Sequence, residues 1–205
     1  MIRSINRFLN QHIAVLLLLA LAVGFSATSL MARLPQEEIQ QDPDWLKFCT
    51  SCEQHDVLNA LAGRWNATLE RSRPGEENTS VGLEVDYQWV LGGRFLLGSM
   101  SGYLNGEQIE GRHVLGYDSF RGDFFEIWFT NQNTSFQLAR GQYDEKSNQL
   151  ILKGVNDDVE LGRRDIPFTQ TITFGDDGSA TFEFERELEK GVKTRTGALF
   201  FSRLD

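Results

Sequence analysis

The sequence predicts an all-β protein, an antiparallel up-and-down barrel of about ten strands preceded by one short helix. Two observations support this fold class. First, apolar and polar residues alternate along many short segments, most clearly over residues 81–91, as in a strand with one buried face. Second, turn-forming residues separate these segments at the spacing of about 8–12 residues that is typical of sandwiches and barrels. A meander of this kind removes its exposed edges most simply by closing on itself.

Three of the strands are predicted within residues 81–118. Two dipeptides separate them, and both can adopt the positive φ angles of two-residue hairpin turns. The predicted strands and turns are, in order, 81–91, Gly92-Gly93, 95–103, Asn105-Gly106 and 109–117.

One further strand precedes this segment and six follow it. A short helix over residues 53–61 leads into the first strand, and Gly63, a residue typical of helix ends, separates the two. The predicted strands are 65–71, 124–131, 136–143, 150–155, 168–174, 180–188 and 192–203.

Residues 1–32 are expected to form a signal peptide or an N-terminal membrane anchor. Arg3 and Arg7 precede an uncharged, mostly apolar segment, which is the layout of an export signal. The same segment reaches the roughly 20 residues that span a bilayer. Because the positive charges lie before it, we expect the body of the protein to be periplasmic or extracellular, either free or anchored to the inner membrane.

Residues 33–52 are expected to form a linker with a Cys-x-x-Cys pair, and residues 53–205 the barrel domain. Cys49 and Cys52 are the only cysteines, and an oxidising compartment favours a small local disulfide between them. A redox or metal role is the alternative. The redox motif normally lies in a βαβ unit, however, and two thiols do not complete a four-ligand zinc site.

The charge of the chain argues against nucleic acid as a partner. The full sequence has a net charge of −9, and removal of residues 1–32 would leave 18 Lys and Arg against 29 Asp and Glu, a net charge of −11. Such a surface repels phosphate backbones. None of the common hydrolase, metalloprotease or phosphate-loop motifs occurs, so no catalytic residue and no metal site is predicted.

Strand alternation places several aromatic and polar side chains in the predicted interior. His113 is the only histidine of the barrel; it can bind a ligand or exchange a proton, or it can simply hydrogen-bond to a neighbouring strand. Arg186 can bind an anionic head group, pair internally with Glu126 or pack on an aromatic ring. Glu126 itself lies on a strand with two apolar faces. The predicted ligand-binding residues are Tyr87, Trp89, His113, Tyr117, Trp128 and Arg186.

The order of several short motifs resembles a known family. The motifs are Gly63-Arg64-Trp65, Leu91-Gly92-Gly93-Arg94-Phe95-Leu96, Gly116-Tyr117-Asp118, Trp128 and Ser202-Arg203. A short helix leading into Gly-x-Trp and a meander is similar to the calycin superfamily, which includes lipocalins, fatty-acid-binding proteins and nitrobindin-like barrels. More narrowly, residues 55–203 resemble the secreted bacterial family catalogued as domain of unknown function fifteen seventy-nine.

The resemblance implies a calycin-like, or lipocalin-like, barrel with a small-molecule pocket, and it brings no established activity. It also implies that Trp65 packs against Arg203 and closes one end of the barrel. Nitrobindin-like barrels hold haem through a histidine near the C-terminus. No histidine follows His113 in this chain, and we therefore predict no cofactor.

We expect the barrel to bind a small, mostly apolar or amphipathic molecule, with an anionic head group as one form of it. An isomerase or hydrolase that uses His113 or Glu126, with Arg186 as anion anchor, is the second hypothesis. A structural or interaction module with a solid core is the third. An open apolar cavity would favour binding, and a cavity that holds a carboxylate and an imidazole within hydrogen-bond reach would favour catalysis.

Overall fold

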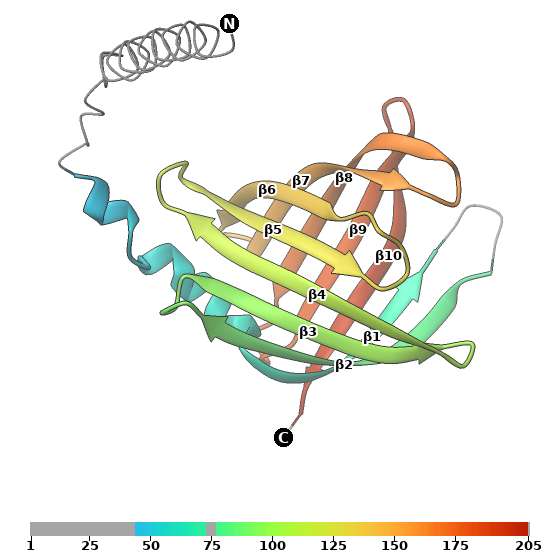
Figure 1. The fold of residues 1–205 in the computed structure, drawn as a ribbon, viewed down its shortest axis with the longest axis horizontal. Helices are drawn as coiled ribbons and strands as arrows, with labels where there is room; N and C mark the ends of the chain where they lie inside the picture. Colours follow the sequence, from blue (N-terminus) through green and yellow to red (C-terminus); the bar gives the residue numbers. More distant parts are fainter. Residues whose placement is uncertain (1–43, 73–76, 205) are drawn as a thin grey trace, which may run out of the picture. The chain divides into compact units, whose positions relative to one another are not determined.

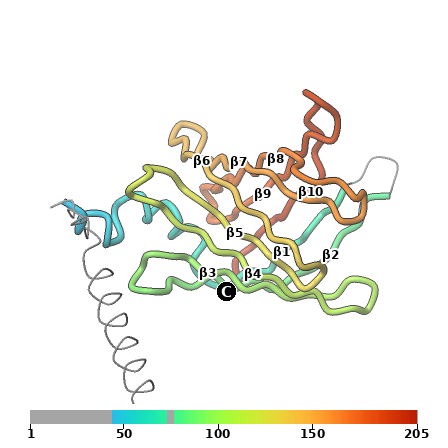
Figure 2. Tube along the Cα trace, turned by 45° about the horizontal axis from the view of Figure 1, so that its top comes forward, coloured from blue at the N-terminus to red at the C-terminus, as the bar shows by residue number. Residues whose placement is uncertain are grey.

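The computed structural model describes residues 44–72 and 77–204, which form a closed antiparallel barrel of ten strands (Figure 1). Each strand pairs with the next along the chain, and β1 also pairs with β10, so the first and last strands lie side by side (Figure 2). Two short 3-10 helices, η1 and η2, precede the barrel. The bounds are η1 (Trp45–Phe48), η2 (Glu53–Leu61), β1 (Gly63–Arg71), β2 (Thr79–Val90), β3 (Phe95–Leu104), β4 (Glu107–Asp118), β5 (Asp123–Thr130), β6 (Gln137–Asp144), β7 (Gln149–Asp158), β8 (Arg163–Phe174), β9 (Ala180–Glu189) and β10 (Val192–Arg203).

The expected signal peptide or anchor, residues 1–32, and residues 33–43 of the expected linker lie outside the described residues. Over residues 44–72 and 77–204, no helix is long and apolar enough to cross a membrane. The helix η2 begins at Glu53, the first residue of the expected barrel domain.

The predicted fold class is confirmed, and every predicted strand is present. Asn105 and Gly106 form the predicted two-residue turn between β3 and β4, with φ angles of 53° and 86°. The turn between β2 and β3 is longer than predicted, because Val90 pairs with Phe95 and four residues lie between them. In that turn, Leu91 and the two glycines that follow it all have positive φ angles.

The hairpin of β7 and β8 also extends further than the predicted segments, 150–155 and 168–174. The added residues are mostly polar and include Pro167, so they carry no apolar alternation. The ladder nevertheless continues, with a register shift between Asn156 and Asp158. As a result, Asn156 belongs to the barrel wall and its side chain is buried.

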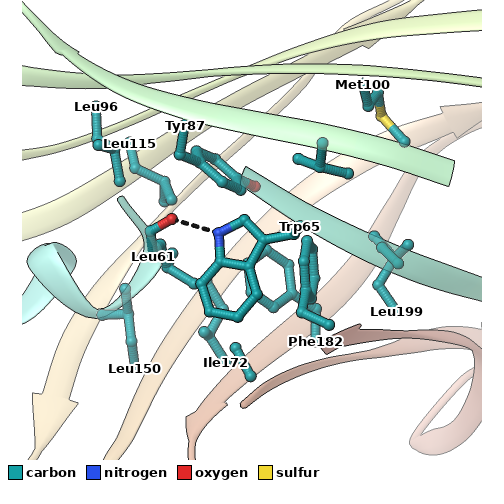
Figure 3. Packing of buried hydrophobic residues seen from close by; sticks show 14 of the residues in the cluster. Leu61, Trp65, Tyr87, Leu96, Met100, Leu115, Leu150, Ile172, Phe182 and Leu199 are labelled. Atoms are coloured by element: carbon teal, nitrogen blue, oxygen red, sulfur yellow. Dashed lines mark hydrogen bonds between the residues drawn. The ribbon is translucent and has the colours of Figure 1, made fainter. Parts of the chain in front are cut away.

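One end of the barrel, here the sealed end, is closed by η2 and Trp65. The Trp65 ring is fully buried, and its Nε1 donates a hydrogen bond of 2.7 Å to the Leu61 carbonyl (Figure 3). The guanidinium carbon of Arg203 lies 4.5 Å from the centre of the Trp65 ring. The same guanidinium donates to the carbonyls of Ala60 and Ala62, so it ties the end of β10 to the end of η2.

Apolar side chains fill the half of the barrel next to the sealed end. They come from η2 and from the sealed-end halves of the strands, and several surround Trp65 in Figure 3. Because this half is packed with side chains, any interior space must lie toward the other end. Fully buried members of this part of the core are Leu58, Leu61, Leu96, Leu115, Leu150, Ile172 and Phe182.

The disulfide predicted between Cys49 and Cys52 is not formed in the structure, where both cysteines are free. The two sulfur atoms face different partners. Cys52 is the N-cap residue of η2, and its Sγ lies 3.4 Å from His55 Nδ1. Cys49 Sγ lies 3.5 Å from the Trp45 carbonyl oxygen, and the Cys49 carbonyl accepts a hydrogen bond from Arg94. The start of the domain is thus held by backbone and side-chain hydrogen bonds.

We predict that Trp65→Ala destabilises the fold by about 3–5 kcal/mol, because it leaves a large cavity at the sealed end. Arg203→Lys should cost less, about 0.5–2 kcal/mol, because the Trp65 ring stays buried and only the guanidinium contacts are lost. Urea unfolding of the two variants and the wild type measures both effects. Equal and small losses would show that Trp65 does not seal the barrel.

Candidate functional site

A cavity of about 480 Å³ lies at the end of the barrel opposite η2, here the open end. It is formed where odd-numbered strands finish and even-numbered strands begin. Its apolar side chains include Leu69, Val81, Met100, Leu104, Ile109, Trp128, Phe168, Phe184, Leu188 and Leu199. Polar residues also contribute to the lining, and they include Glu70, Arg71, Gln137, Asn156, Asp157, Asp158, Glu160 and Arg186.

A buried network of hydrogen bonds lies between the packed half of the barrel and this cavity. Tyr87 Oη is 2.8 Å from His113 Nδ1, and His113 Nε2 is 3.0 Å from Glu126 Oε2. These three side chains are 2%, 2% and 0% exposed. The Trp128 ring packs edge-on against the imidazole, with ring centres 4.7 Å apart.

Gly98 allows Tyr87 and His113 to meet. Tyr87 is on β2 and His113 is on β4, and Gly98 on the intervening strand β3 is the register partner of both. A Cβ atom on Gly98 would lie 2.4 Å from a carbon of the Tyr87 ring. Only a residue without a side chain therefore lets the tyrosine lie across β3 and reach the imidazole.

The network continues from Glu126 to three amide side chains. Gln137 Nε2 donates to Glu126 Oε1 at 3.0 Å and to Gln170 Oε1 at 3.4 Å. Asn156 Nδ2 donates to Gln137 Oε1 at 3.2 Å. Two buried atoms at the end of this network, Asn156 Oδ1 and Gln170 Nε2, have no hydrogen-bond partner in the described part of the chain. Gln137 and Asn156 also line the cavity, so we call these two amides the cavity floor.

The imidazole and the carboxyl group of the network are occupied by each other and by their neighbours. His113 uses both ring nitrogens, and Glu126 uses both oxygens. The void beside Tyr87, His113 and Trp128 has no room for a water molecule. Among the described residues, no three His, Cys, Asp or Glu side chains lie close enough to hold a metal ion. The arrangement thus presents amide groups to the cavity and keeps the His–Glu pair behind them.

Contrary to the prediction, the expected ligand-binding residues do not line one interior space. Trp128 and Arg186 line the cavity, whereas Tyr87 and His113 belong to the network behind it. Trp89 lies at the sealed end, where its Nε1 donates to Asn59 of η2.

Tyr117 also lies at the sealed end, with its ring centre 6.0 Å from that of His55 and 4.9 Å from that of Phe124. Alternation along a strand identifies the face of a side chain but not its height along the barrel axis. This is why residues from opposite ends were grouped together.

Arg186 contacts an acidic side chain of its own domain at the open end. Its Nη1 is 2.9 Å from Asp158 Oδ2, and the Glu126 carboxyl group, the internal partner considered for it, is instead held by His113 and Gln137. The charged residues along the cavity are the acids Glu70, Asp157, Asp158 and Glu160 and the bases Arg71 and Arg186, and strand alternation turns the Glu70 and Asp157 side chains to the outer face. Asp158 and Arg186 pair with each other, and the chain carries a net charge of −9, which opposes an anionic ligand.

Gln137, Asn156 and Gln170 were not identified from the sequence. Gln170 lies between Phe168 and Ile172 on the inward face of β8, so strict alternation there was the available signal. Asn156 lies beyond the predicted end of its strand. Gln137 begins β6, where no pattern yet defines a face.

The fold and the cavity together define a ten-stranded calycin-like barrel, closed at one end and hollow at the other. The chain belongs to the family described as "Protein of unknown function (DUF1579)", whose model matches residues 50–200. A crystal structure of Rv2717c from M. tuberculosis is similar in fold, with a TM-score of 0.54 and 13% sequence identity, over 75% of this chain and 99% of that one. None of the curated proteins matches this sequence.

Burial, and secondarily the nearby charge of Glu126, raise the pKa of the Tyr87 hydroxyl well above its ordinary value of 10.0. The folded state therefore holds this proton more tightly than the unfolded state does. The stabilisation is fully present below about pH 10 and is lost as the pH rises above it, because the unfolded tyrosine ionises first.

We predict that wild-type stability falls by about 1.4 kcal/mol more than that of Tyr87→Phe when the pH is raised from about 9 to about 11. Tyr103→Phe is the matched control, because this ring is 69% exposed. Its pH dependence should equal that of the wild type. Denaturant unfolding over this pH range measures the difference, and identical slopes for all three proteins would contradict the assignment.

Proposed function

We propose that this protein binds a small, mostly apolar molecule inside the open end of its barrel. The observation that carries the proposal is the cavity of about 480 Å³, which lies within the range of roughly 300–1,000 Å³ typical of ligand sites. Apolar walls from strands all around the barrel supply the driving force, and the amides of Gln137 and Asn156 supply a polar contact at the floor. The export signal expected in residues 1–32 would place this binding outside the cytoplasm.

Binding is favoured over catalysis by the way the reactive groups are used. A general base needs a free atom within reach of the substrate. Both nitrogens of His113 and both oxygens of Glu126 already have partners, and neither residue lines the cavity. The cavity itself argues against a structural module with a solid core.

The ligand should be neutral or only weakly charged. The chain carries a net charge of −9, and Arg186, the expected anion anchor, already contacts the carboxylate of Asp158. An anionic head group would have to compete with that carboxylate for the guanidinium. Neutral amphipathic molecules avoid this competition.

We predict that the neutral fluorophore prodan binds the wild-type protein saturably and that Leu69→Trp weakens binding at least about tenfold, or about 1.4 kcal/mol. Leu69 lines the cavity, and an indole at this position occupies part of its volume. Val155→Trp is the control, because Val155 is 53% exposed on the outer face of β7 and does not line the cavity.

The blue shift of prodan emission measures binding, and circular dichroism checks that each variant is folded. Absence of saturable binding by the wild type would refute the proposal. Equal affinities of folded Leu69→Trp and Val155→Trp would show that the probe binds elsewhere.

A further inference from the structure

We propose that the ligand carries a neutral hydroxyl group that donates a hydrogen bond to Asn156 Oδ1, and that Glu126 fixes the direction of this acceptor through Gln137. This inference rests on the proposed binding function and specifies the chemical class of the ligand. It follows from the polarity of the buried network, in which each hydrogen bond determines the orientation of the next amide.

The first step is the contact between Glu126 and Gln137. An amide NH2 group can only donate, an amide carbonyl can only accept, and Glu126 Oε1 accepts the Gln137 hydrogen bond at 3.0 Å. The other carboxyl oxygen is held by His113, which is held in turn by Tyr87. The Gln137 NH2 group therefore faces the carboxyl group, and its carbonyl oxygen faces away from it.

The second step is the contact between Gln137 and Asn156. The Gln137 carbonyl accepts from Asn156 Nδ2 at 3.2 Å, so the NH2 group of Asn156 faces the network. The carbonyl oxygen of Asn156 is therefore on the side of the amide that points away from Gln137. Asn156 is also one of the residues that line the cavity. This oxygen is buried, in a side chain that is 9% exposed, and no described residue donates to it. A buried acceptor without a donor costs free energy, which a donating ligand would recover.

Gln170 accepts a second hydrogen bond from the NH2 group of Gln137. Its Oε1 accepts from Gln137 Nε2 at 3.4 Å, which leaves Gln170 Nε2 as a fully buried donor without a partner in the described residues. The network thus ends in one unpaired acceptor and one unpaired donor, both on amides that bond to Gln137. Of the two residues only Asn156 lines the cavity, so a ligand there can contact the acceptor. A hydroxyl group can donate to this acceptor, whereas ethers, esters and carboxylates can only accept.

Charge acts in the same direction as hydrogen bonding. A carboxylate at the floor would face the Asn156 carbonyl oxygen and would lie in the same barrel interior as the Glu126 carboxyl group, whose partners are all supplied by the protein. It would also have to approach a chain with a net charge of −9. A neutral alcohol meets neither obstacle.

The test compares 1-decanol with 1-methoxydecane, which has a similar apolar chain but no donor, and with decanoate. Each is used to displace prodan, which also lacks a donor, from the full-length protein. We expect 1-decanol to bind at least about tenfold more tightly than the ether or decanoate. In Glu126→Gln the residue can present either end of its amide to Gln137, so the alcohol-to-ether ratio should fall to within about threefold.

Glu84→Gln is the matched control, because it makes the same change on an exposed side chain of β2 and should keep the wild-type ratio. If Glu126→Gln does not fold, Asn156→Leu removes the acceptor directly and should weaken decanol while leaving the ether unaffected.

Equal binding of alcohol and ether by the wild type, or tighter binding of decanoate, would overturn the inference while prodan binding left the proposed function intact. A ratio unchanged in folded Glu126→Gln would overturn the role of Glu126. Failure of prodan itself to bind would instead refute the proposed function.

Discussion

The interior of this barrel is organised around one buried carboxyl group, that of Glu126, whose two oxygens must both be satisfied without water. A buried carboxyl group without partners would cost several kcal/mol, so its neighbours are constrained in type and direction. His113 satisfies one oxygen and Gln137 the other. These two contacts in turn constrain further side chains. Tyr87 Oη is the hydrogen-bond partner of the other imidazole nitrogen, and the Asn156 amide donates to Gln137, so that its oxygen faces away from the network.

This polar layer separates two halves of the barrel with different roles. On one side, η2 and Trp65 close the end, and apolar side chains leave no large space. On the other side, the strands enclose a cavity of about 480 Å³ whose floor carries amides instead of a charged group. A filled end gives the stability that allows the other end to remain hollow, because a cavity removes favourable packing contacts from its lining. The division also explains why Trp89 and Tyr117, on inward faces, are remote from the cavity.

Much of the fold was predictable because period-two alternation and turn residues are local properties. The inward positions of Tyr87, His113 and Arg186 followed from the same alternation. What local pattern could not supply was height along the barrel axis and contact across strands. Gly98 is the clearest example. It is needed because its register partners on the two neighbouring strands are Tyr87 and His113, and the residues around Gly98 in the sequence do not reveal that register. Asn156 was missed because its strand continues past the end of the apolar pattern, through a register shift.

A crystal structure of the protein with 1-decanol tests most directly the proposal that a ligand hydroxyl meets Asn156 Oδ1, an acceptor whose direction is set by Glu126. We expect electron density for the alkyl chain among the apolar walls of the open end, with the hydroxyl oxygen about 2.6–3.0 Å from Asn156 Oδ1. Gln137 should keep its contacts with Glu126 and Asn156. Density with the alkyl chain at the floor and the hydroxyl in solvent at the opening, or an Asn156 side chain turned so that its NH2 group faces the alcohol, would contradict the account.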